Sequence, residues 1–308
     1  MNAHVAEPLA AAVRTTCPYC GVGCGVIARP DGRAGAAIEG DPEHPSNFGR
    51  LCSKGSALGE TLGLDGRLLH PMIDGRRASW HAALAVAAEG FTRIADEHGP
   101  DAVAFYLSGQ LLTEDYYVAN KLMKGFIGSS NVETNSRLCM ASSVAGHRRA
   151  FGADTVPGCY EDLDQADLVV LVGSNAAWCH PIPFRRMLDA RARRGTRIVV
   201  VDPRRTATGD EADLFLPIAP GTDTALFSGL LVHLAEAGTL DRDFIESHTT
   251  GFAEALARAR EIAPTTAATA RATGLPAPAV QAFFELFAAA ERTVTCFINC
   301  HLATGRIG

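Results

Sequence analysis

Asp167-Leu-Val-Val-Leu-Val-Gly-Ser-Asn175 is the stretch that decides the fold, because five apolar residues run directly into a glycine turn. Such a run predicts a strand buried on both faces, which is typical of parallel sheets. The same pattern returns at Arg197–Val201 and ends in Asp202-Pro203-Arg204. Between the two runs, residues 183–194 have the pattern of a helix, and Gly195 marks its end. Strand, helix and strand in this order predict a parallel βαβ unit.

The same alternation extends outward in both directions from this unit. Apolar residues recur every three or four positions from Trp80 to Glu97, which predicts a helix. Further helices are predicted at 113–126, 223–237 and 241–290, and further strands at Asp101–Leu107, Leu214–Ile218 and Thr293–Ile298. Apolar strands that alternate with helices predict an α/β fold with a doubly wound, mostly parallel sheet.

Turn residues with ligand-binding potential follow four of the predicted strands. They are Gly109-Gln110, Gly173-Ser174-Asn175, Asp202-Pro203-Arg204 and Gly221-Thr222-Asp223. In doubly wound sheets, ligands bind at the carboxyl ends of the strands, and helix N-termini there favour phosphate. Any one of these turns is what an ordinary βα connection uses, but four on one edge favour a nucleotide-like ligand. The chain has no G-x-G-x-x-G fingerprint, so support for an NAD site is weak.

Four cysteines near the N-terminus predict a metal centre. Cys17, Cys20 and Cys24 have the spacing C-x2-C-x3-C, and Cys52 follows in Leu51-Cys52-Ser53-Lys54-Gly55. Four thiolates without a histidine suit a [4Fe–4S] cluster or a structural zinc ion. The unequal spacing favours the cluster, because three close thiolates fit three corners of a cubane. A disulfide set is disfavoured, since this is not a short secreted scaffold. The glycine- and cysteine-rich residues 14–67 are therefore predicted to form a small metal-organised domain.

Cys139 is a second candidate metal ligand. It stands just before a predicted helix, in Asn135-Ser-Arg-Leu-Cys139-Met140. A helix start lowers the pKa of a thiol, and a thiolate suits a soft metal. A lone cysteine is also commonly a small buried hydrophobe, so the residues alone leave both interpretations open. Cys159, Cys179, Cys296 and Cys300 have no ligand spacing and are interpreted as structural.

Composition excludes several classes of function. The 308 residues, 47% apolar and 20% charged, can form about two globular domains. A net charge of −6 provides no basic footprint for nucleic acid, and no apolar run is long enough to span a membrane. Met1–Thr16 lacks a signal core and an Arg-Arg pair, and nine cysteines suit a reducing compartment. These features predict a cytoplasmic protein that binds neither nucleic acid nor membrane.

Six motifs carry a resemblance that spans essentially the whole chain. They are CPYCGVGCGV (17–26), LCSKG (51–55), TNSRLCMASS (134–143), GSNAAWCHP (173–181), VVDPRRT (200–206) and PGTDTAL (220–226). In this order they resemble the bacterial assimilatory nitrate reductases, within the molybdopterin oxidoreductase (DMSO reductase-like) superfamily. The resemblance implies a small N-terminal [4Fe–4S] domain followed by α/β domains of the formate dehydrogenase/DMSO reductase type.

The resemblance also implies a role for individual residues. Cys17, Cys20, Cys24 and Cys52 would hold the [4Fe–4S] cluster, and Cys139 would ligate molybdenum beside two molybdopterin guanine dinucleotides. Lys54 would lie between cluster and pterin on the electron route. Pterin contacts would come from Gln110 and Asn135, and Gly173 to His180, including Ser174 and Asn175, would line the diphosphate and pterin. The guanosine end would be held by Asp202, Pro203, Arg204, Arg205, Thr206, Gly221, Thr222 and Asp223.

Met140, directly after the implied metal ligand, bears on the choice of substrate. Related formate dehydrogenases have a histidine there for proton handling, and a thioether cannot accept a proton at neutral pH. The resemblance therefore implies reduction of nitrate to nitrite by oxygen-atom transfer, with ferredoxin, flavodoxin or an NADH-dependent reductase as electron donor. Two alternatives stay open: a formate dehydrogenase or other molybdopterin oxidoreductase, and a non-catalytic iron–sulfur fragment.

The chain departs from the family pattern near its C-terminus. Family members carry a G-x-N-Q segment at a point where Phe297-Ile298-Asn299 is continuous here, and they continue into a C-terminal cofactor-binding domain. The sequence thus predicts an N-terminal fragment with an internal deletion. The predicted domains are 14–67 for the cluster, 68–138 plus 298–308 as a partial α/β domain, and 139–297 for a molybdopterin guanine dinucleotide.

Overall fold

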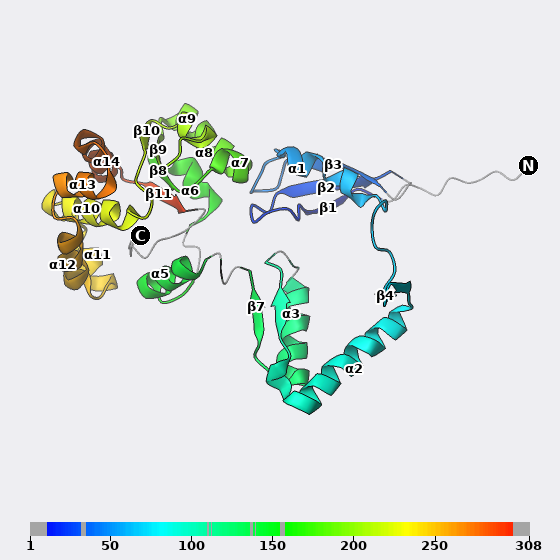
Figure 1. Ribbon diagram of the computed structural model, residues 1–308. Helices are drawn as coiled ribbons and strands as arrows, with labels where there is room; N and C mark the ends of the chain where they lie inside the picture. Colours follow the sequence, from blue (N-terminus) through cyan, green and yellow to red (C-terminus); the bar gives the residue numbers. More distant parts are fainter. Residues whose placement is uncertain are drawn as a thin grey trace, which may run out of the picture. The chain divides into compact units, whose positions relative to one another are not determined.

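Four parallel strands, in the order β10–β9–β8–β11, form the central sheet of the second half of the chain in this computed structural model (Figure 1). The structure describes residues 11–31, 35–109, 111, 113–135, 138, 140–154 and 158–297. The chain divides into two compact units, Met1–Cys139 and Met140–Gly308. The strands of the central sheet are β8 (Leu168–Val172), β9 (Arg197–Val201), β10 (Leu214–Leu216) and β11 (Thr293–Phe297). The domain boundaries proposed from the sequence remain a prediction.

Helices cover both faces of this sheet, as a doubly wound fold requires. Every residue of β8 is buried. Leu168, Val170 and Val172 pack into a cluster with α10 (Asp223–Glu236), α13 (Thr266–Thr273) and α14 (Ala277–Ala289). Val169 and Leu171 pack on the other face with α6 (Tyr160–Gln165), α7 (Ala176–Cys179) and α8 (Pro181–Arg194) (Figure 1). Because successive side chains of a strand point to opposite faces, the continuous apolar run contributes to the hydrophobic cores on both faces of the sheet.

The ends of the elements in this unit follow local chemistry. Gly195 ends α8 in the left-handed conformation at φ 79°, as its position in the sequence predicts. The predicted strand Leu214–Ile218 stops at Leu216 instead, because Pro217 has no N–H to donate to a neighbouring strand. The remaining helices of the unit are α5 (Ala141–Phe151), α9 (Ala207–Asp210), α11 (Arg242–His248) and α12 (Phe252–Ile262).

The first unit begins with a three-stranded antiparallel sheet. Its strands are β1 (Val13–Thr16), β2 (Gly25–Pro30) and β3 (Ala36–Gly40). In the register of this sheet, Thr16 pairs with Gly25, so the segment between them is a hairpin connection. The short helix α1 (Ser53–Ser56) and a 3-10 turn, η1 (Leu58–Leu62), follow the sheet. A two-stranded ribbon of β4 (Met72–Ile73) and β5 (Arg76–Arg77) comes next.

The rest of the first unit is a short parallel pair with two helices. β6 (Phe105–Leu107) pairs with β7 (Val132–Thr134). α2 (Trp80–His98) agrees with its prediction, whereas the predicted strand from Asp101 starts only at Phe105 because residues 100–102 form a 3-10 turn, η2. The helix predicted to Phe126 is α3 (Thr113–Lys121) followed by a π-helix, η3 (Leu122–Ile127).

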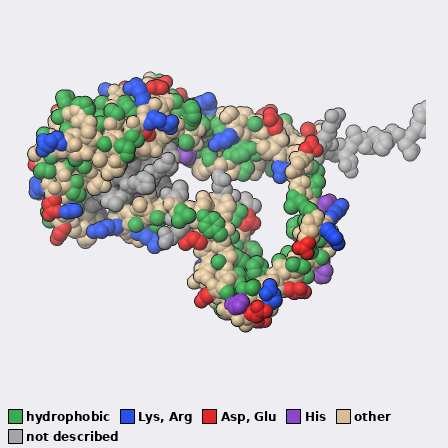
Figure 2. Space-filling view, in the orientation of Figure 1, with side chains coloured by type: hydrophobic (Ala, Val, Ile, Leu, Met, Phe, Trp, Pro, Cys, Tyr) green, Lys and Arg blue, Asp and Glu red, His purple; other side chains and the backbone are tan. Residues whose placement is uncertain are grey.

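Many apolar side chains of this segment are exposed. α2 contains no buried residue, and Trp80, Leu84, Tyr117 and Phe126 are between 62% and 76% exposed. Figure 2 shows apolar side chains on the surface over these helices. No helix in the described part of the chain combines the length and hydropathy needed to cross a membrane.

Candidate functional site

The hairpin connection between β1 and β2 carries three of the four N-terminal cysteines. Cys17 follows β1 directly, and Cys24 immediately precedes β2. The Cys17 N–H donates to the Cys24 carbonyl over 2.8 Å, which extends the antiparallel ladder and closes the loop that contains Cys20. Cys52 is the N-cap residue of α1. Local strand pairing thus fixes the ends of the C-x2-C-x3-C motif, and a helix start presents the fourth cysteine.

The Cys24 thiol lies within electrostatic range of the other three cysteines. Burial, together with negative charge on Cys20, Cys17 and Cys52, raises the pKa of Cys24 to about 11. Among the described residues, no three His, Cys, Asp or Glu side chains converge tightly enough to share one metal ion. The sulfurs around a cluster lie farther apart, because the cluster's own atoms lie between them. A donor set of four thiols fits a [4Fe–4S] cluster.

Asn47 ties the segment after β3 to the backbone next to Cys24. Its Oδ1 accepts from the Gly25 N–H at 2.8 Å, and its Nδ2 donates to the carbonyls of Gly25 at 3.0 Å and Arg50 at 2.9 Å. The Asn47 side chain is fully buried. A Cβ on Gly25 would lie 2.3 Å from His44 Cγ, so only glycine lets this segment pack so closely. Sequence reasoning missed Asn47, because these bonds join residues far apart in the chain.

Replacement of Asn47 by leucine is expected to open the three-stranded sheet. The change leaves the buried Gly25 N–H without its acceptor, whereas the Gly25 carbonyl keeps the Asp41 N–H as donor. We expect the free energy of local opening to fall by about 1 to 3 kcal/mol. Hydrogen–deuterium exchange of β1–β3 peptides, followed by mass spectrometry, measures this locally. Asn120→Leu is the control, since that half-buried amide donates to the Tyr116 carbonyl of its own helix and has no other bond to the residues that the structure describes. Equal exchange in β1–β3 peptides of both variants would contradict the role given to Asn47.

Lys54 lies in α1, two residues after Cys52, with an exposed side chain.

Gly109 and Asn135 lie close together just after the ends of β6 and β7. A Cβ atom added to Gly109 would lie only 2.7 Å from Asn135 Oδ1. Gln110 and Cys139 lie outside the described residues. Met140 is the N-cap residue of α5 and is 38% exposed. The parallel register thus brings one predicted pterin contact, Asn135, beside the strand end that precedes Gln110.

The carboxyl ends of β8 and β9 place two unsatisfied hydroxyl groups on one edge of the sheet. The Gly173 N–H donates to the Val201 carbonyl at 2.9 Å, which joins the two loops at their start. Ser174 Oγ and Thr206 Oγ1 are buried and have no hydrogen-bond partner among the described residues. Buried hydroxyls rarely lack partners. This edge therefore fits a polar ligand that completes their hydrogen bonds, as predicted for a nucleotide.

The other predicted residues of this edge differ in whether their side chains already form hydrogen bonds within the protein. Asp202 Oδ1 accepts from the Arg204 N–H at 2.8 Å, and Arg205 Nε donates to Asp210 at 3.0 Å. Gly221 adopts φ 79°, which leads the chain into α10. Asp223 starts α10 and is half-buried, and no described residue hydrogen-bonds to its carboxylate. His180, the N-cap residue of α8, is half-buried, and Pro203 is exposed.

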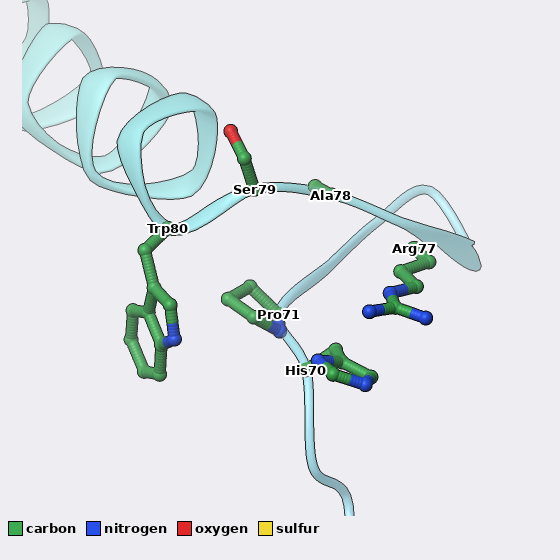
Figure 3. Close-up of a pocket in the computed structure, with 6 residues that line it drawn as sticks. All are labelled: His70, Pro71, Arg77, Ala78, Ser79 and Trp80. Carbon is green, nitrogen blue, oxygen red and sulfur yellow. The ribbon is translucent and has the colours of Figure 1, made fainter.

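An open pocket of about 530 Å³ lies where β5 runs into α2. It is lined by His70, Pro71, Arg77, Ala78, Ser79 and Trp80 (Figure 3). The Ser79 hydroxyl caps α2 by accepting from the Ala82 N–H at 3.1 Å, and Trp80 is 69% exposed. Since no sequence-predicted site residue lines this pocket, it adds nothing to the cluster or nucleotide sites.

Comparisons with known proteins agree with the two kinds of site. Residues 67–252 match the molybdopterin oxidoreductase family, and residues 10–62 match the molybdopterin oxidoreductase Fe4S4 domain. A nitrate reductase of Klebsiella oxytoca is 52% identical over 96% of this chain and 35% of its own length. One of Shewanella frigidimarina is 44% identical over 96% of this chain and 34% of its own length.

A solved structure has the same fold. Acetylene hydratase from Pelobacter acetylenicus superposes with a TM-score of 0.80 at 24% identity, over 92% of this chain and 39% of its own. The chain spans about a third of the length of the curated relatives it matches. Because the matched regions carry an Fe4S4 domain and a molybdopterin domain, the cofactors of this family are a [4Fe–4S] cluster and molybdopterin. The chain belongs to the molybdopterin oxidoreductase family.

Proposed function

We propose that this chain forms the cluster-binding part and one dinucleotide-binding part of a nitrate reductase. The observation that carries the proposal is the pair of buried hydroxyls, Ser174 Oγ and Thr206 Oγ1, which lack a partner among the described residues and follow two adjacent parallel strands. This is the edge where doubly wound sheets bind dinucleotides. Identity of 52% to a nitrate reductase supports nitrate as the substrate.

In this proposal the four thiols of the N-terminal quartet hold the [4Fe–4S] cluster. Cys17, Cys20 and Cys24 come from one hairpin connection, and Cys52 comes from the start of α1. Cluster potentials depend on hydrogen bonds to sulfur and on solvent exposure. The bonds from Asn47 to Gly25 hold the backbone next to Cys24 and limit its movement. Lys54, two residues beyond Cys52, would donate a hydrogen bond on the electron route between cluster and pterin.

Molybdopterin guanine dinucleotide would lie along the carboxyl edge of the second sheet. Residues from Gly173 to His180 would hold its diphosphate and pterin, and those of the loops after β9 and β10 its guanosine. The β9 loop contributes Asp202 to Thr206, and the β10 loop contributes Gly221 to Asp223. Gln110 and Asn135 would contact pterin, and Cys139 would ligate molybdenum. Support comes from the strand-end placement of the second-unit residues and from the unsatisfied hydroxyls.

When bound, the molybdenum centre supplies the oxygen-atom transfer that reduces nitrate to nitrite, with electrons delivered through the cluster. The residues of this chain position the cofactors. Met140 cannot take up a proton at neutral pH, so it offers no base for formate oxidation. The electron donor is proposed to be ferredoxin, flavodoxin or an NADH-dependent reductase, and the role to be nitrate assimilation in the cytoplasm.

Metal and nucleotide analysis of the anaerobically purified chain tests the proposal. We expect iron, molybdenum and, after acid hydrolysis, guanine nucleotide in the same sample. We also expect nitrite when dithionite-reduced viologen and nitrate are supplied to the chain together with the remainder of a homologous enzyme.

Each alternative gives a different result in these assays. Formate-dependent viologen reduction without nitrite formation would replace the nitrate proposal with a formate dehydrogenase. Iron without molybdenum or guanine nucleotide would reduce the chain to an iron–sulfur module. Zinc in place of iron would overturn the cluster assignment itself.

A further inference from the structure

Asn175 occupies the N-cap position of α7, yet its side chain does not cap the helix. An N-cap asparagine ordinarily accepts from a backbone N–H in the first turn of its helix. Here the Ala177 N–H donates instead to Thr208 Oγ1 at 3.0 Å, and the Thr208 hydroxyl donates in turn to Asn175 Oδ1 at 3.1 Å. Thr208 lies in α9, in the loop region after the neighbouring strand β9. Thr208, 33 positions after Asn175 in the sequence, therefore accepts the hydrogen bond that the Asn175 side chain would ordinarily accept as the cap of α7.

The geometry points to Thr208 as a positioning residue that aims the Asn175 amide at the diphosphate of the dinucleotide. Its side chain is fully buried, so its hydroxyl has little freedom to choose other partners. With Oδ1 held by Thr208, Nδ2 stays available to a ligand, since no described residue accepts a hydrogen bond from it. The neighbouring Ser174 Oγ is likewise without a partner among the described residues. These groups present hydrogen-bond donors to an anion.

This inference rests on the proposed dinucleotide site and adds a residue outside its contact set. In a Thr208→Val variant the shape of the side chain is kept, but both hydrogen bonds are lost. Asn175 Oδ1 can then turn to the Ala177 N–H and act as an ordinary cap. The helix keeps its cap, while Nδ2 is withdrawn from the ligand. We therefore expect Thr208→Val to weaken binding of the dinucleotide while the free energy of unfolding changes little.

Titration of the full chain with guanosine diphosphate by calorimetry tests this role. We expect Thr208→Val to weaken binding about tenfold, the effect of one hydrogen bond to a charged group. Thr208→Ser, which keeps the hydroxyl, should restore binding. Asn175→Ala should weaken binding to a similar extent, and adding Thr208→Val to it should cost little more, since both changes remove one coupled unit. Thr273→Val is the control, because that threonine is also fully buried but its hydroxyl, within the described part of the chain, bonds to the backbone of α13 alone.

The outcomes separate this inference from the function on which it rests. If the unaltered chain does not bind guanosine diphosphate, the proposed nucleotide site itself fails, and the positioning role fails with it. If the unaltered chain binds and Thr208→Val binds equally well, only the positioning role is overturned. Additive losses in the double variant would also reject it, because independent contacts add.

Discussion

Replacement of Cys24 by alanine is expected to abolish the [4Fe–4S] cluster. Cys24 is the thiol that lies within electrostatic range of the other three, and it is 8% exposed. Its removal leaves one iron without a thiolate and opens the buried side of the site. We expect the iron content of anaerobically purified chain to fall from about four atoms to near zero. The visible absorption of the cluster and the EPR signal of its reduced form should disappear with it.

The matched control for this change is Cys159→Ser. Cys159 is exposed and caps α6 in a capping box with Asp162, whose carboxylate accepts from the Cys159 N–H at 2.7 Å. Serine is a good N-cap residue, so this variant should keep both its fold and its full iron content. A chain that retains four irons after loss of Cys24, or loses them in both variants, would refute the ligand assignment.

The central sheet was predictable because its strands are buried on both faces. Leu168–Val172 and residues 198–201 are continuous apolar runs, and a glycine ends the helix between them, so local chemistry and tertiary structure agree. The edges were less predictable. Pro217 ends β10 early, and the strand predicted from Asp101 is shortened by a 3-10 turn. In both places a backbone hydrogen-bonding preference overrides an apolar pattern.

The positions of the loops that carry the candidate site could be predicted from sequence, whereas the residues that support those loops could not. Ser174 and Thr206 were candidates because strand ends can be located from sequence, and their hydroxyls are buried without a partner among the described residues. The spacing of the cysteines is visible in the sequence directly. Asn47 and Thr208 were missed, because each acts through bonds to residues 22 and 33 positions away. Nothing in the sequence near Asn47 distinguishes it from an ordinary turn residue. Such bonds exist only after the fold has brought distant segments together.

Asp223→Asn is expected to remove the preference of the chain for guanine over adenine nucleotides. Guanine presents two adjacent N–H donors on its pairing edge, which a carboxylate accepts together, whereas adenine presents a donor beside an acceptor. No described residue hydrogen-bonds to the Asp223 carboxylate, whereas Asp202 already accepts from the Arg204 N–H. A bidentate contact of this kind contributes about 1 to 3 kcal/mol of base discrimination. We therefore expect affinity for guanosine diphosphate to fall by about 10- to 100-fold. Affinity for adenosine diphosphate should rise, because the asparagine amide presents an acceptor beside a donor, which matches adenine.

Comparison with Asp243→Asn distinguishes a base contact from a purely structural role of Asp223. Both aspartates lie in the first turn of a helix, α10 and α11, where negative charge interacts favourably with the positive end of the helix dipole. If Asp223 acted only on the dipole, both variants would lose similar stability, and neither would change nucleotide choice. Competition between guanosine and adenosine diphosphates on each full-length variant measures that choice directly. Equal ratios in Asp223→Asn and the unaltered chain would remove Asp223 from the guanine site, because the amide can form only one of the two bonds.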